Sequence, residues 1–224
     1  MDRKSQQLGG ILIILAGLIA IVGSVLHPMQ PETLEEFADL GALWTASHVA
    51  IGIAGTLFLI AALHLARDFQ RSAGEGWALA GCGVLLLGGV TLMVVGALET
   101  AGFSRVLAAQ EAGSAVAAEH AFLAVTAVME SMGTAAGYLF PVATTAFAFG
   151  MLRDQSWPAW LAGLGVAIGV ASLALNVSGT ALGPVQDVLN RYLGRGWFVV
   201  VGVMFMGRAR AAVWATRRQV ERPR

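Results

Sequence analysis

Six long apolar segments restrict what this chain can fold into more than any other feature. They cover residues 9–27, 44–67, 77–99, 119–140 or beyond, 158–178 and 196–215. Each is close to the roughly 20 residues that a helix needs to cross the hydrocarbon core of a bilayer. Backbone polar groups find no water in that core, so such segments are expected to be helical. The sequence therefore predicts an all-α bundle of six transmembrane helices, in one integral membrane domain over residues 1–224.

The composition agrees with a membrane protein. Of the 224 residues, 57% are hydrophobic and 12% are charged, whereas about 25% of an average soluble domain is charged. The formal net charge is zero, which gives no basic surface for nucleic acid. The expected partners are the lipid bilayer, a hydrophobic small molecule, and a second copy of the chain or a larger membrane complex.

The positive charges are divided unequally between the two sides of the predicted bundle. One side holds eleven: Arg3, Lys4, Arg67, Arg71, Arg153, Arg208, Arg210, Arg217, Arg218, Arg222 and Arg224. The other side holds three, Arg105, Arg191 and Arg195. Because Lys and Arg accumulate in cytoplasmic loops, both termini are expected in the cytoplasm, in a multi-pass protein of the inner (plasma) membrane.

The three long connections on the outer side show the pattern of short amphipathic helices. Thr33 and Glu36 have the spacing of a capping box, which satisfies free amides at a helix start. Phe103 and Val106 lie one helical turn apart, and Pro184 suits the first turn of a third helix. Such helices are expected to lie in the membrane interface over the bundle.

The outer helix ends are also regularly spaced. His27 and His48 are 21 residues apart, and so are Glu99 and His120. Repeated spacing of this kind favours a three-fold pseudo-repeat of helix hairpins.

The fourth apolar segment is longer than one span needs, since residues 119–152 are predominantly apolar. Pro141 lies within it and removes the hydrogen bond to the carbonyl four residues earlier. We therefore expect one helix with a kink near Gly137. Two separate spans would invert the rest of the chain and place the arginine-rich C-terminus outside, against the charge pattern.

Four residues that can bind a metal fall at the outer ends of predicted helices. His27 ends the first, His48 begins the second, Glu99 ends the third and His120 begins the fourth. Imidazole and carboxylate are ligands of zinc and similar divalent metals. We therefore interpret the four as a metal centre, with the alternative that interfacial histidines only bind loop backbone and lipid head groups.

A single b-type haem is a further alternative, with His48 and His120 as axial ligands on facing helices. Gly52 and Gly55 share the helical face of His48 and could make room for a flat macrocycle. The same glycines could instead serve close packing between membrane helices. A divalent metal is favoured over haem.

Glu130 is the acid that the sequence places deepest in the membrane. It lies ten residues after His120, about 15 Å further along a helix. A carboxylate facing lipid there would be costly, so Glu130 is expected to face the bundle interior and stay protonated. It is interpreted either as a catalytic or proton-relay acid, or as a neutral group that bonds a neighbouring helix.

Short motifs resemble a group of uncharacterised bacterial six-helix membrane proteins classed under domains of unknown function. These motifs are the His27 and Pro28 pair, the spacing of Trp44 and His48, and the sequence MLRDQSWPAWLAGLG before the fifth segment. The resemblance implies a bacterial inner-membrane protein. It implies no activity and no site residue.

Together these features favour a ligand-binding or catalytic membrane protein with an outward-facing His and Glu centre and a divalent metal. Besides the single-haem protein, two alternatives remain open: a non-catalytic subunit of a membrane complex and a small-solute transporter. Transporters place their sites near the midplane on broken helices, and Glu130 and Pro141 fit that pattern.

Overall fold

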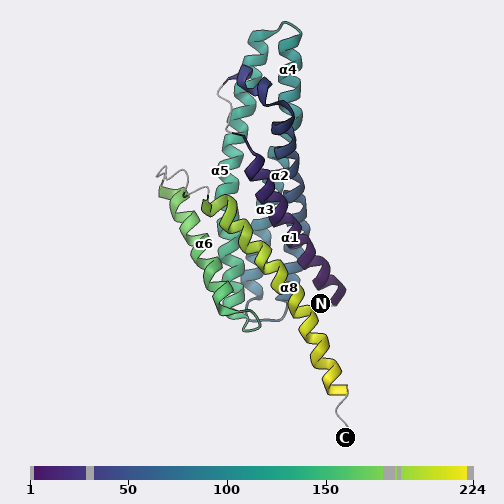
Figure 1. Cartoon of the computed structure of the whole chain (residues 1–224). Helices are drawn as coiled ribbons and strands as arrows, with labels where there is room; N and C mark the ends of the chain where they lie inside the picture. The colour runs from purple at the N-terminus through teal and green to yellow at the C-terminus, as the bar shows by residue number, and fades with distance from the viewer. Residues whose placement is uncertain (1–2, 29–32, 179–184, 186–187, 221–224) are drawn as a thin grey trace.

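The structure is a computed structural model that describes residues 3–28, 33–178, 185 and 188–220; of residues 37, 38 and 209–220 it describes the backbone only. All regular structure in these residues is helical. The α-helices are α1 (Arg3–Leu26), α2 (Leu34–Asp68), α3 (Glu75–Ala97), α4 (Phe103–Glu111), α5 (Ala115–Arg153), α6 (Ala159–Ser178) and α8 (Gly194–Val220) (Figure 1). Two π-helical turns, η1 (Leu98–Gly102) and η2 (Val188–Leu193), precede α4 and α8.

The described residues contain five helices long and apolar enough to cross a membrane. They are Arg3–Leu26, Asp39–Asp68, Glu75–Glu111, Ala115–Arg153 and Ala159–Ser178. This confirms an all-helical, multi-pass bundle. The sixth predicted segment lies in α8, whose side chains are described only as far as Arg208. The sixth span, the sides of the termini and the pseudo-repeat stay predictions.

The helices pack in an order that decides which side chains can meet. Going around the bundle, the large contacts join α8 to α1, α1 to α2, α2 to α3, α3 to α5 and α5 to α6 (Figure 1). Thus α3 lies between α2 and α5. α1 begins and α8 ends at the same end of the bundle (Figure 1).

Glycine contacts bring α2 and α3 close together. A Cβ added to Gly89 would lie 3.0 Å from the Gly55 carbonyl oxygen and 2.7 Å from Cδ2 of Leu59. A Cβ added to Gly55 would lie 2.9 Å from the Gly89 carbonyl oxygen. At the outer end, a Cβ on Gly96 would lie 3.3 Å from Cα of Gly52. These faces are therefore used for helix packing, as in other membrane bundles, and not to make room for a macrocycle.

The described parts of the connections that were predicted on the outer side are mainly helical, but they differ from separate interfacial helices. The N-cap bond of the predicted capping box is present: the Glu36 amide donates to Oγ1 of Thr33 at 3.2 Å, and α2 begins at Leu34. α2 is kinked at Gly41, whose φ of 39° favours glycine. α4 does not turn aside, because Leu98, Gly102 and Phe103 all keep right-handed helical dihedrals and continue α3 in one direction. Pro184 lies outside the described residues.

Pro141 lies inside one continuous helix, α5. The carbonyl that a proline leaves without a donor is that of Gly137, and Nδ2 of Asn176 on α6 donates to it at 2.5 Å. The hydroxyl of Tyr138 in turn donates to the Asn176 carbonyl at 3.0 Å. These bonds replace the lost helical bond and join α5 to α6.

Two apolar clusters lie along the bundle. The large cluster includes Phe58, Phe147, Trp197 and Phe205. The small cluster consists of Trp44, Phe103, Val106, Ala118, Phe122 and Met129, with Leu34 and Leu40 packed on it. Three elements contribute residues to both clusters: α2, the rod formed by α3 and α4, and α5. Between them lie the polar residues of the candidate site.

Candidate metal centre and cavity

His27, His48 and Glu99 come together between the two clusters. One ligand atom of each lies within 4.8 Å of those of the other two. His27 follows the last residue of α1, His48 lies on α2 and Glu99 lies in η1. His48 is 1% exposed and Glu99 is 6% exposed, so a water shell does not surround the pair. Three of the four residues expected to form a metal centre are thus neighbours in space.

The hydrogen bonds of His48 determine which of its nitrogens faces the site. Nδ1 lies 2.8 Å from the carbonyl oxygen of Trp44, which can only accept, so Nδ1 carries the proton. Nε2 then has a lone pair and contacts Oε2 of Glu99. Neither of these two buried atoms has a hydrogen-bonding partner among the described residues. Two acceptors in contact repel each other unless a proton or a cation lies between them.

His27 is oriented in the same way. Its Nδ1 lies 2.6 Å from the carbonyl oxygen of Pro28, so Nε2 is left as the ligand nitrogen. A histidine that donates its second nitrogen to a carbonyl is the usual arrangement for metal ligands, because the bond fixes the ring and raises its basicity. Burial lowers the pKa of His27 to about 4, and the positive charges of Arg191 and Arg195 act in the same direction. His27 is therefore neutral at pH 7.

Trp44 holds the two imidazoles in place from the side of the small cluster. Its ring centroid lies 4.4 Å from that of His48 and 5.5 Å from that of His27. Phe103 packs edge-on against Trp44 at 5.7 Å. The two imidazoles touch each other, with centroids 4.6 Å apart. Direct contact leaves no space for a macrocycle between His27 and His48.

A cavity of about 610 Å³ opens beside the three residues, and all three line it. Its polar wall includes Ser24, Glu130, Thr134, Tyr138, Asn176, Asn190, Arg191 and Arg195, and its apolar wall includes Ile51, Leu92, Val95, Met129 and Phe140. The volume falls in the range of small-molecule sites, about 300–1,000 Å³. The centre is therefore accessible to a ligand.

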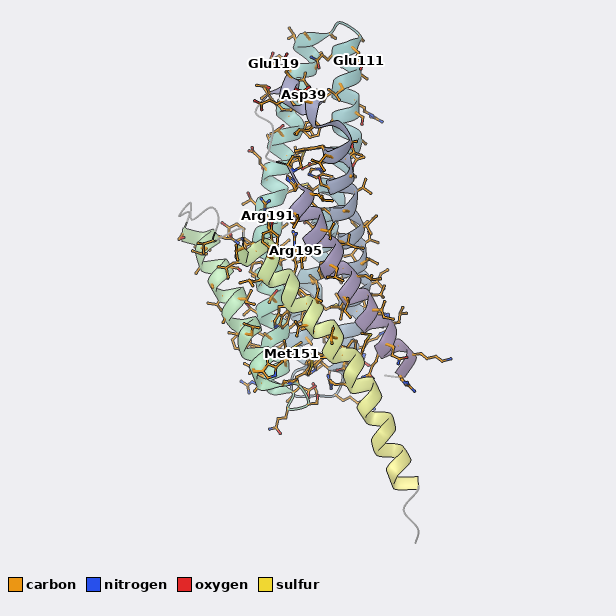
Figure 2. All side chains as sticks on the ribbon, viewed as in Figure 1. Asp39, Glu111, Glu119, Met151, Arg191 and Arg195 are labelled. Atoms are coloured by element: carbon orange, nitrogen blue, oxygen red, sulfur yellow. The ribbon has the colours of Figure 1, made fainter. Side chains whose placement is uncertain are left out.

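The two arginines of this wall were missed as site residues. Arg191 and Arg195 entered the sequence analysis only as charges of the outer side. Figure 2 shows both near the upper end of α8, far below Asp39, Glu111 and Glu119 at the tip of the α4 and α5 hairpin. The guanidinium of Arg195 donates to the Ala20 carbonyl at 2.6 Å and to Oγ of Ser24. Arg191 and Arg195 are four residues apart and would therefore lie on one face of a helix, next to an apolar helix. This spacing is the sequence feature that could have identified them as site residues.

His120, the fourth expected ligand, does not join the centre. It is exposed on α5. The inward face of that helix is set by Ala118, Phe122 and Met129, which belong to the small cluster. Two residues after Ala118, a side chain points to the opposite side of a helix. α3 also separates α5 from α2 and His48, so the expected pairing of His48 with His120 is not formed.

Glu130 was expected to face the bundle interior, and the structure places it in the lining of the cavity. It is exposed, and it lines the cavity together with Gly133 and Thr134. Met129, the preceding residue, takes the inward position on α5. Glu130 therefore shares a cavity with the three clustered residues and can act on a ligand bound there.

Comparison of the chain with known protein families, with curated proteins and with solved structures gave no match.

Proposed function

We propose that the protein is a membrane metalloprotein that binds one divalent, zinc-like metal through His27, His48 and Glu99. The observation that carries the proposal is the contact of two buried acceptors, Nε2 of His48 and Oε2 of Glu99. A metal ion between them would replace their repulsion by two bonds. Ligand atoms at bonds of about 2 Å lie about 3–4 Å apart around one metal, so small side-chain rotations suffice.

Two imidazoles and one carboxylate would leave a fourth position of the metal open. Three protein ligands and an open position are typical of catalytic zinc, whereas structural zinc is closed by four. The cavity that all three residues line supplies the space for a ligand at that position. The metal would act there as a Lewis acid, or lower the pKa of a bound water.

Glu130 is the residue we assign to proton transfer at this position. It lines the same cavity without belonging to the three-residue cluster. A carboxylate that is not a metal ligand can take a proton from a metal-bound water or a ligand. Glu130→Gln should therefore leave the metal in place.

The test is the metal content of purified protein in lipid nanodiscs, stripped with chelator and reloaded with Zn²⁺ or Co²⁺. We expect one metal per chain in the native protein, and a large loss in His48→Ala and in Glu99→Gln, which keeps the size of the side chain. His120→Ala is the matched control, because His120 is exposed and outside the cluster. The Co²⁺ absorption spectrum should show four-coordinate geometry.

Equal metal content in native protein and His48→Ala would overturn the proposal, as would a loss in His120→Ala. A haem absorption band in protein purified without added metal would favour the haem alternative. Loss of metal in Glu130→Gln would make Glu130 a ligand and remove it from proton transfer. Binding should also raise the melting temperature, by an amount that corresponds to about 2.7 kcal/mol at a metal concentration 100 times Kd.

A further inference from the structure

Arg191 and Arg195, which we call the arginine wall of the cavity, indicate the chemical class of its ligand. We propose that the cavity binds an amphiphile whose oxyanion head group, a phosphate or a carboxylate, is held by Arg191 and Arg195 beside the metal centre. Its hydrocarbon part would lie along Ile51, Leu92, Val95, Met129 and Phe140. This inference deepens the proposed function and rests on it for the metal.

The charges of the cavity lining support an anionic ligand. Four lining residues have acidic or basic side chains: the acids Glu99 and Glu130 and the bases Arg191 and Arg195. The two acids are matched by two bases, and a divalent metal would then add two positive charges beside the buried Glu99 and His48. An anion is the ligand that compensates such an excess, since charges out of water interact strongly. A neutral or cationic ligand would leave the excess in place.

Arg191 and Arg195 line the same cavity as His27, His48 and Glu99. Arg195 and His27 line the same cavity, and Arg195 bonds Ser24 and Ala20, which lie within eight residues of His27 on the same segment. Guanidinium groups suit oxyanions because their planar donors match two oxygens at once. Asn176 and Asn190 add amide groups to the same wall, and Nδ2 of Asn190 donates to Oδ1 of Asn176 at 2.9 Å.

The apolar residues of the lining explain why the anion should carry a hydrocarbon chain. Ile51 comes from α2, Leu92 and Val95 from α3, and Met129 and Phe140 from α5, so three helices supply it. A free inorganic ion would leave this apolar surface in contact with water. Each methylene that a ligand buries there contributes about 0.8 kcal/mol of transfer free energy, and this is the gain that an inorganic ion lacks.

The test uses hexyl phosphate, inorganic phosphate, hexanol and hexyltrimethylammonium with Co²⁺-loaded protein in nanodiscs. Binding is followed by calorimetry and by the Co²⁺ spectrum. We expect hexyl phosphate to bind at least about tenfold more tightly than inorganic phosphate, and the other two not to bind. Arg191→Gln should weaken hexyl phosphate at least about tenfold with unchanged metal content. Arg153→Gln, an exposed arginine outside the cavity, is the matched control.

Arg195 needs a pair of variants because it also bonds the backbone of α1. Arg195→Lys keeps the charge and should weaken hexyl phosphate less than Arg195→Gln does. Equal affinity for inorganic phosphate and hexyl phosphate would refute the proposal that the ligand is an amphiphile. Equal effects of Arg191→Gln and Arg153→Gln on hexyl phosphate binding would refute the proposal that the arginine wall holds the head group. Mass spectrometry of untreated protein then separates a retained anionic lipid from a free oxyanion.

Metal content is measured on the same samples, so the two proposals can fail separately. A metal-loaded protein that does not bind hexyl phosphate would refute the inference and leave the metal centre standing. Arginine-dependent binding of hexyl phosphate by a protein that takes up no metal would refute the metal centre and retain the anion site.

Discussion

The half of the bundle around the large cluster and the half around the small cluster differ in what fills the space between helices. In the large cluster, Phe58, Phe147 and Phe205 are at most 1% exposed, and glycines let the backbones touch. In the small cluster, six residues pack beside a cavity with polar and charged walls. The difference indicates that packing holds one half together, whereas the other keeps open space and polar walls for a ligand.

Two matched truncations test this comparison most directly. Phe147→Ala should lower the free energy of unfolding by about 3–5 kcal/mol, because it leaves a closed void among tightly packed neighbours. Phe122→Ala in the small cluster should cost clearly less, since Phe122 belongs to a cluster of only six buried residues and fewer neighbours lose contacts. Both values come from thermal or denaturant unfolding in the same nanodiscs. Equal losses would show that the two halves are equally packed.

The glycine contacts give the next largest effect. Gly89→Val should destabilise the protein by about 1–3 kcal/mol, because its Cβ would press on the Gly55 carbonyl and on Leu59. Gly83→Val on the same helix is the control, since a Cβ there meets nothing within 4 Å. The melting temperatures of the two variants provide the measurement. A Gly83 variant as unstable as the Gly89 variant would point to helix propensity, not packing, as the cause.

The boundary between the halves is tested at Asn176. Asn176→Leu removes the donor to the Gly137 carbonyl and should cost about 1–3 kcal/mol. In a Pro141→Ala background the new backbone amide can bond that carbonyl, so the same change should cost less. A double-mutant cycle of unfolding free energies measures the difference. Additive effects would mean that Asn176 does not replace the bond lost at Pro141.

The sequence allowed the helices to be predicted better than the site. Segment length and the positive charges identified the apolar helices, and the capping box at Thr33 located the start of α2. His27, His48 and Glu99 were predictable because residues at outer helix ends lie at one depth. Depth does not determine which way a side chain faces around its helix. His120 is at a similar helix end, but it is exposed on α5 and lies outside the three-residue cluster.

The missing information lies in the π-helical turns and in the order of helices. Glu99 lies in η1, and Asn190 and Arg191 lie in η2. Each such turn widens the helix and rotates the side chains of the next turns around the helix axis, and π-helical turns are frequent at functional sites. The hydrophobic periodicity of the sequence does not predict these π-helical turns. The position of α3 between α2 and α5 is likewise a property of packing that one sequence does not reveal.

The lengths of α5 and of the rod formed by α3 and α4 affect how far the cavity lies from the membrane surface. At 1.5 Å per residue, the 39 residues of α5 extend about 58 Å, and about 44 Å along the membrane normal even at a 40° tilt. The hydrocarbon core is only about 30 Å thick. The exposed acids Asp39, Glu111 and Glu119 mark the end that stands in water (Figure 2). Bilayer thickness therefore sets how far the cavity lies from the lipid head groups, so a thinner or thicker membrane would change how the proposed amphiphile enters.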